Sequence, residues 1–203
     1  MAGRIALFEW PQTLSVISGF PQNMQAHWNL VPNKSVLMLR QESDLQADLA
    51  LWGLTPQWMT DFSRAAPHAR LETIEQQPMF KQAYAQRRCA IVANGFFEWR
   101  GKERKQAYWL FQAQQPLIFL AGIWESFDIA GKQYLSVAML TYQAAQLRRP
   151  LLLNKKMMRR WLNKDESLVG LADDLVVQPQ LFERKVSRWV SDPDFDGPEC
   201  LMP

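Results

Sequence analysis

The chain has 203 residues, 48% of them hydrophobic, and a formal net charge of +3. That length allows one sizeable core, so we expect a single domain over residues 1–203. Cys89 and Cys200 have no CxxC partner, and neither a charged leader nor an 18-residue apolar run is present; we therefore expect a cytoplasmic protein with no metal, no cofactor and no membrane partner.

Short apolar runs of strand length recur along the chain. Turn-like pieces such as Gly101-Lys102 and Ala130-Gly131 separate several of them and favour antiparallel pairing. We predict an α+β fold with a mainly antiparallel, barrel-like β core and a few peripheral helices. The predicted strands are Ser35–Arg40, Ala47–Trp52, Arg88–Ala93, Ala107–Gln112, Leu117–Ile123 and Tyr134–Thr141.

Two segments have the pattern of helices. Thr73–Gln86 is expected to be helical, with a break or restart at Pro78. Asn154 is a suitable N-cap for a second helix that runs from Lys155 to about Asn163. Its apolar stripe is expected to pack in the core and consists of Met157, Met158, Trp161 and Leu162.

The charge is unevenly distributed. Residues 191–203 form an acidic tail with four acids and no Lys or Arg, which leaves 23 bases against 20 − 4 = 16 acids, or +7, for residues 1–190. Basic groups interleaved with aromatic residues suit a groove for single-stranded nucleic acid, whereas the alternative is an ordinary solvated surface. The bases gather at Arg87-Arg88, Arg100 to Lys105, Arg148-Arg149 and Lys155 to Arg160.

One carboxylate lies in an apolar, aromatic strand. Glu98 is the fourth residue of Gly95-Phe96-Phe97-Glu98-Trp99. Burial penalises the charged form of a carboxyl group and can tune it for proton transfer near pH 7. One interpretation is therefore a general acid/base, and the other is a structural Glu paired with an Arg on a neighbouring strand.

Several segments, taken in order, resemble one family over nearly the whole chain. That family is SRAP, the SOS response-associated peptidases or abasic site processing proteins, and the resemblance implies its fold. The segments are Met1-Ala2-Gly3-Arg4, Trp28-Asn29-Leu30-Val31-Pro32, Trp52-Gly53-Leu54-Thr55-Pro56-Gln57-Trp58, His68-Ala69-Arg70-Leu71-Glu72-Thr73, Arg88-Cys89-Ala90, Gly95 to Trp99, Ala121-Gly122-Ile123-Trp124, Arg148-Arg149-Pro150 and Val186-Ser187.

The resemblance implies an active site that has diverged here. In the family, a cysteine exposed by removal of the initiator Met attacks the aldehyde of an abasic site in single-stranded DNA, and its thiol closes a stable thiazolidine. An Asn, a Glu and a His complete that site. Here Ala2, His68 and Gln146 stand at the Cys, Asn and His positions, and Glu98 alone matches.

Two functions follow from that divergence. The first is an abasic-site protein of the DNA damage response whose Ala2 α-amine forms a reversible Schiff base, with Glu98 moving the protons. No thiazolidine can close without the thiol. The second is a catalytically inactive homologue that only binds single-stranded DNA. His68 is either a relocated acid/base group or a product of drift.

DNA contacts are also implied by the resemblance. Arg4 and Arg70 match phosphate-contacting arginines, although Arg70 has an alternative as the partner of Glu72 or Glu98. We expect a monomer whose partners are single-stranded and abasic-site DNA. The DNA-binding set is Arg4, Asn29, Trp52, Trp58, Arg70, Arg148 and Arg149, with both tryptophans expected to support or stack on bases.

Overall fold

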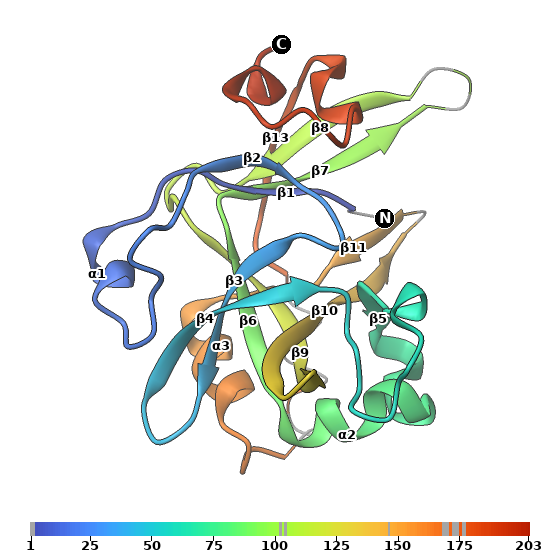
Figure 1. Cartoon of the computed structure of the whole chain (residues 1–203). Helices are drawn as coiled ribbons and strands as arrows, with labels where there is room; N and C mark the ends of the chain where they lie inside the picture. Colours follow the sequence, from blue (N-terminus) through green and yellow to red (C-terminus); the bar gives the residue numbers. More distant parts are fainter. Residues whose placement is uncertain are drawn as a thin grey trace.

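The computed structural model describes residues 3–101, 103, 105–145, 147–167, 171, 175 and 178–203 (Figure 1). The α-helices whose bounds lie within these residues are α1 (Gln12–Ser15), α2 (Pro78–Gln86) and α3 (Lys155–Leu162), and 3₁₀ turns cover Phe62–Arg64, Leu71–Gln76, Arg188–Ser191 and Pro198–Leu201. The strands are β1 (Ile5–Leu7), β2 (His27–Leu30), β3 (Ser35–Gln41), β4 (Leu45–Trp52), β5 (His68–Arg70), β6 (Arg88–Ala93), β7 (Gly95–Arg100), β8 (Gln106–Phe111), β9 (Ile118–Ile129), β10 (Lys132–Ala144), β11 (Leu147–Pro150), β12 (Leu152–Leu153) and β13 (Phe182–Lys185).

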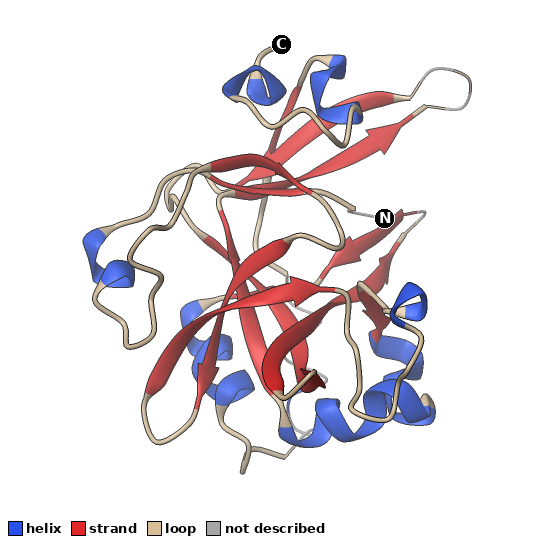
Figure 2. Ribbon diagram, in the orientation of Figure 1, coloured by secondary structure: helices blue, strands red, loops and turns tan. Residues whose placement is uncertain are grey.

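A closed barrel forms the centre of the domain. Its strands follow the order β10, β4, β3, β6 and β9, and β9 pairs with β10 to close it. All neighbours are antiparallel except β4 and β10, which are parallel, as are β5 and β10. The predicted α+β fold with a mainly antiparallel barrel is confirmed, and the short helices lie around it (Figure 2).

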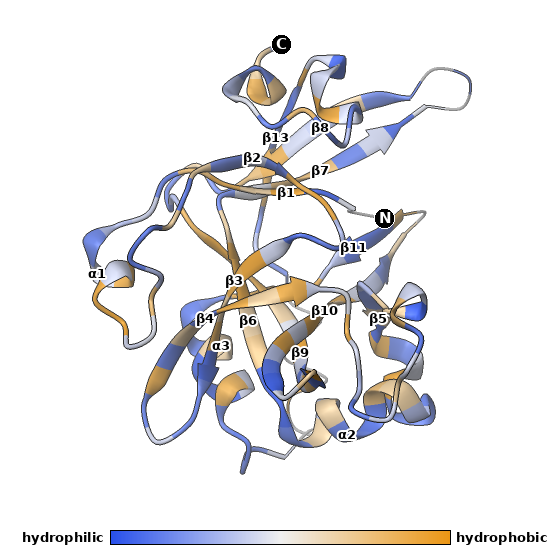
Figure 3. Cartoon of the chain, in the orientation of Figure 1, coloured by the Kyte–Doolittle hydropathy of each residue, from blue (hydrophilic) through white to orange (hydrophobic). Residues whose placement is uncertain are grey.

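A second sheet lies beside the barrel. It has the order β13, β8, β7, β1 and β2, and its outer face is covered by the C-terminal segment (Figure 1). A small apolar cluster fills the space between this sheet and the C-terminal segment. Within it, the centres of the Phe97 and Trp109 rings are 4.7 Å apart. Hydrophobic residues otherwise concentrate along the barrel strands β3, β6 and β9 (Figure 3).

Both predicted helical segments form. Leu71–Gln76 is a 3₁₀ turn, and Pro78 restarts the chain as α2 because proline suits the first turn of a helix. The Asn154 Oδ1 accepts from the Met157 N–H at 2.8 Å, so Asn154 is the N-cap of α3. Of the predicted apolar stripe, only Met158 remains half-buried.

The acidic tail packs against β2. The Asp196 carboxylate accepts from the backbone N–H groups of Trp28 and Asn29 at 2.6 and 2.8 Å, and it pairs with the His27 ring at 2.6 Å. The tail therefore follows the protein surface. Within the described ranges, no helix is both long and apolar enough to cross a bilayer.

Candidate active site beside Glu98

Glu98 is buried and held by two arginines. Only 4% of the residue is exposed. Arg149, on β11, donates from Nε to Oε1 at 2.8 Å and from Nη2 to Oε2 at 3.1 Å, and Arg100 donates to Oε2 at 2.9 Å. An ionised carboxylate offers about four acceptor positions, so these three bonds leave capacity mainly at Oε1. Glu98 is thus paired with arginine, although Arg100 lies on the same strand and Arg149 in the other sheet rather than on a neighbouring strand. This pairing does not exclude proton transfer.

The motif around Glu98 requires the glycine at its start. A Cβ on Gly95 would lie 2.3 Å from the Leu110 carbonyl oxygen, so only glycine allows β8 to approach this closely. Side chains then alternate along β7. Phe97 and Trp99 join the small apolar cluster, whereas Glu98 and Arg100 point to the opposite face.

Arg100 links Glu98 to the adjacent sheet. It also binds Glu183, on β13, at 2.8 and 2.7 Å, and its guanidinium lies 4.7 Å from the centre of the Tyr108 ring. The hydrogen bonds to Glu183 and then to Glu98 raise the pKa of Arg100, with burial opposing them. The same hydrogen bond from Arg100 lowers the pKa of Glu183. Alternating charges therefore fix the Glu98 carboxylate in place.

The register of β1 brings the amino-terminal segment to Glu98. Ile5 pairs with Phe96, and the Phe97 N–H donates to the Arg4 carbonyl at 3.1 Å. If this antiparallel register continues one residue beyond Arg4 and Phe97, Gly3 lies opposite Glu98. A Cβ on Gly3 would meet no atom within 4 Å, so there is open space at this end of β1.

A cleft of about 770 Å³ opens between the ends of β7 and the β10–β11 hairpin. Trp99, Arg100 and Arg149 line it, together with Leu147. Tyr142 pairs across the hairpin with Arg149, so both side chains project from the same face. Burial raises the pKa of Tyr142, Arg149 lowers it, and Glu98 raises it. Tyr142 thus belongs to the Glu98 environment.

The sequence matches one family over nearly the whole chain. The model of the family described as SOS response associated peptidase (SRAP) covers residues 1–193. The chain belongs to the SRAP family.

Curated SRAP relatives are distant in sequence, and this chain matches them over most of its own length. The chain is 28% identical over 188 residues to the abasic site processing protein YedK of Escherichia coli, covering 87% of this chain and 84% of YedK. It is 25% identical to YoqW of Bacillus subtilis, covering 99% of both, and 23% identical to rat HMCES, covering 90% of this chain and 66% of HMCES. Both are also named abasic site processing proteins.

Solved structures share the SRAP-like fold. A crystal structure of a protein from Bacteroides thetaiotaomicron superposes with a TM-score of 0.85 at 16% identity and covers 99% of both chains. A second, from Bordetella bronchiseptica, has a TM-score of 0.76 at 20% identity and covers 92% of this chain and 100% of that one.

Some of the expected SRAP site residues come together, and others do not. Glu98 and Arg149 are in direct contact. Arg148 points elsewhere, to Glu72 at 3.0 Å. His68 lies on β5, with its ring edge-on to Trp52 at 5.6 Å. Ala2 and Gln146 are outside the described residues.

Two expected DNA contacts are wrong. Trp52 has no exposed surface, and its indole N–H donates to the Pro67 carbonyl at 2.8 Å, so it supports the fold and cannot stack on a base. Asn29 is 3% exposed, and its amide N–H groups donate to the backbone carbonyls of Asp192 and Phe195. Its oxygen accepts from Arg4 at 3.2 Å, so Asn29 positions that arginine.

The remaining expected contacts are accessible to different degrees. Trp58 is 67% exposed, and Arg70 is exposed at the end of β5. In the described part of the chain Arg70 forms no ion pair with Glu72 or Glu98, which contradicts its structural alternative. Arg4 is half-buried over Trp99, on the opposite face of β7 from Glu98, and burial lowers its pKa.

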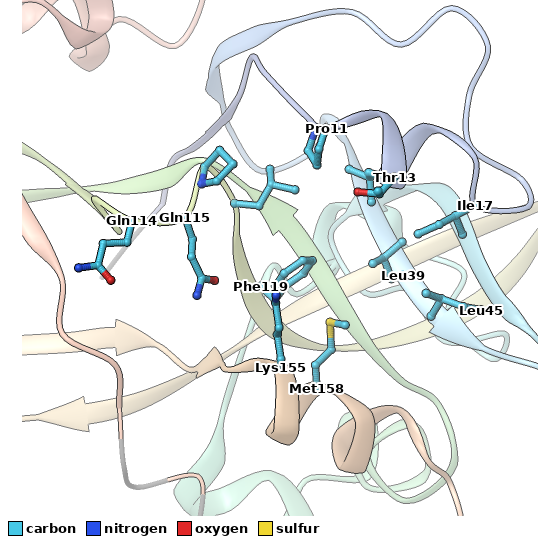
Figure 4. Close-up of a pocket in the computed structure, with 13 residues that line it drawn as sticks. Pro11, Thr13, Ile17, Leu39, Leu45, Gln114, Gln115, Phe119, Lys155 and Met158 are labelled. Carbon is cyan, nitrogen blue, oxygen red and sulfur yellow. The ribbon is translucent and has the colours of Figure 1, made fainter.

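A separate apolar pocket lies between α1, the segment around Gln114 and Gln115, and α3 (Figure 4). Its volume is about 540 Å³, and it contains none of the expected site residues. No cluster of three or more potential metal ligands occurs within the described ranges. The candidate active site is therefore the cleft lined by Arg100 and Arg149, the two arginines that bind Glu98, and we call it the Glu98 cleft.

Proposed function

We propose that the chain binds single-stranded DNA at an abasic site and that the Ala2 α-amine forms a reversible imine with the lesion beside Glu98. The observation that carries this proposal is the β1–β7 register, which directs the amino-terminal segment toward a buried carboxylate whose two arginine partners line a cleft. Membership of the SRAP family supports abasic-site DNA as the substrate.

The proposed chemistry needs only groups of this chain and the lesion. After hydrolysis of the Met1 peptide bond, the free Ala2 amine attacks the aldehyde carbon C1′ of the ring-opened sugar. An α-amine has a pKa of about 7.7–8.0, so roughly a tenth or more is neutral at pH 7. Glu98 accepts a proton from the attacking amine and returns one to the departing hydroxyl, which leaves as water. Water reverses the reaction.

No nearby thiol substitutes for the missing cysteine. Cys89 is fully buried in β6, and burial raises its pKa. Cys200 is also buried, with a pKa raised by burial. A thiolate is the reactive form, so neither thiol closes a ring on the imine in the folded protein.

The test is reduction of the imine by borohydride on an abasic single-stranded oligonucleotide. We expect a covalent adduct only with reductant, and an intact mass lacking Met1. The matched variant is Ala2→Cys, which restores the thiol and should give an adduct that survives without reductant. Absence of any adduct from both proteins would reject the covalent reaction.

A second candidate function is binding of abasic or single-stranded DNA without chemistry. The engagement of Glu98 by Arg100 and Arg149 favours it, because three hydrogen bonds restrain the only matching catalytic residue. This function predicts affinity for the abasic strand with no trapped adduct.

A further inference from the structure

A further pocket lies apart from the Glu98 cleft, beside residues 124–126 of β9. It has a volume of about 310 Å³ and is formed by the loop around Trp58, the start of α2 and β9. The walls include two indole rings, Trp58 and Trp124, and the polar pair Arg87 and Glu125. Apolar rings combined with a few converging polar groups are typical of a small-molecule site.

The polar pair leaves hydrogen-bonding groups unused. Arg87 Nη2 donates to Glu125 Oε1 at 2.5 Å. Among the described residues, the buried Arg87 Nε has no acceptor, and Glu125 Oε2 has no donor. A buried polar atom without a partner, such as Arg87 Nε, is uncommon in folded proteins. The pair thus offers a ligand one donor at Arg87 and one unoccupied carboxylate oxygen at Glu125.

The aromatic walls are suited to a flat ligand. Trp58 is 67% exposed. The Arg40 guanidinium packs against the Trp124 ring, with its carbon 4.7 Å from the ring centre. Arg40 is itself paired with Asp48 at 2.7 Å. Aromatic side chains of this kind stack on bases of single strands.

We propose that this pocket, the Trp58 pocket, binds a guanine base. Guanine is flat, carries adjacent N1–H and N2–H donors for the Glu125 carboxylate, and carries the O6 acceptor for Arg87. The base comes either from a single strand or from a free guanine nucleotide. The strand-borne case rests on the proposed function, since it requires DNA to extend from the Glu98 cleft.

The experiment measures the affinity of a labelled thymidine-rich oligonucleotide with one abasic site, in which a single guanine is moved through every position. We expect one position to tighten binding by about tenfold. Glu125→Gln and Trp58→Ala should each remove that preference. Trp189→Ala, a change at another exposed indole (55% exposed), should leave it intact.

Free guanosine monophosphate is titrated against the same proteins, with indole fluorescence as the readout. Binding that Trp58→Ala abolishes supports the pocket with a free nucleotide as the source; a positional preference alone supports the strand. The proposal is overturned if neither a positional guanine preference nor binding of guanosine monophosphate is found, or if both persist in Trp58→Ala. Affinity for the guanine-free abasic strand is measured in parallel. If that affinity is retained without any preference for guanine, guanine binding by the Trp58 pocket is rejected and the proposed function is not.

Discussion

Replacing Arg149 tests the Glu98 ion-pair network. Arg149→Gln leaves the Glu98 carboxylate, 4% exposed, with the single hydrogen bond from Arg100 in place of three. Breaking a fully buried ion pair costs about 3–5 kcal/mol. The Arg149 side chain is 29% exposed, and Arg100 remains, so we expect a loss of about 2 kcal/mol in the free energy of unfolding. For a chain of this length, that corresponds to a Tm lower by about 4–8 °C.

The matching background is Glu98→Gln, which removes the buried charge. In that background, Arg149→Gln should cost about 1 kcal/mol less than it does in the unmodified protein. Urea and thermal denaturation followed by circular dichroism give the free energy of unfolding of all four proteins in this double-mutant cycle. Equal costs of Arg149→Gln in both backgrounds would refute the claim that Arg149 acts on stability through Glu98.

Three further outcomes are expected. Arg70→Ala should weaken binding to single strands and reduce the salt slope by about 0.7, whereas a change at the exposed Arg159 of α3, Arg159→Ala, should not. An unchanged slope in Arg70→Ala would show that Arg70 does not line the DNA-binding groove. The native Cys89 thiol should resist alkylation at pH 8 until the chain is denatured, because burial raises its pKa, and rapid native labelling would contradict this. Arg100 lowers the pKa of Glu183, so this carboxylate stabilises the fold above its ordinary pKa and loses that contribution as pH falls through the lowered value. Glu183→Gln should therefore reduce the loss of folding stability on acidification. An unchanged dependence of stability on pH would count against the pairing.

Continuous apolar runs made the barrel predictable. Arg88–Ala93 forms β6 with the predicted bounds, because each of its residues is buried and the run ends at polar neighbours. The β9–β10 hairpin extends beyond the predicted runs to Ile129 and Lys132. Its outer residues are exposed, and the ladder continues because Ala130 and Gly131 take positive φ values of 53° and 81°, which suit a two-residue turn.

Polar edge structure carried no comparable signal. β13, Phe182–Lys185, was not predicted because all four residues are exposed and three are charged. Its strand conformation comes from pairing with β8. No local hydrophobic pattern identifies such a strand, since its stability is supplied by a neighbour about seventy positions away.

The site was only partly visible in the sequence. Glu98 could be identified because a carboxylate in an aromatic strand is unusual, and Arg100 shares its face by the two-residue period of a strand. The contact between Glu98 and Arg149 spans 51 positions and joins two sheets, so spacing could not reveal it. Tyr142 and Glu183 enter the site through strand pairing alone.

Peptide mapping of the borohydride-trapped adduct tests the central claim most directly. We predict that the DNA remnant is attached to the α-nitrogen of Ala2 and that Glu98→Gln reduces the rate of trapping by at least about a hundredfold, the lower end of the range for a general acid/base. An adduct on a lysine side chain, or trapping at an undiminished rate in Glu98→Gln, would contradict it.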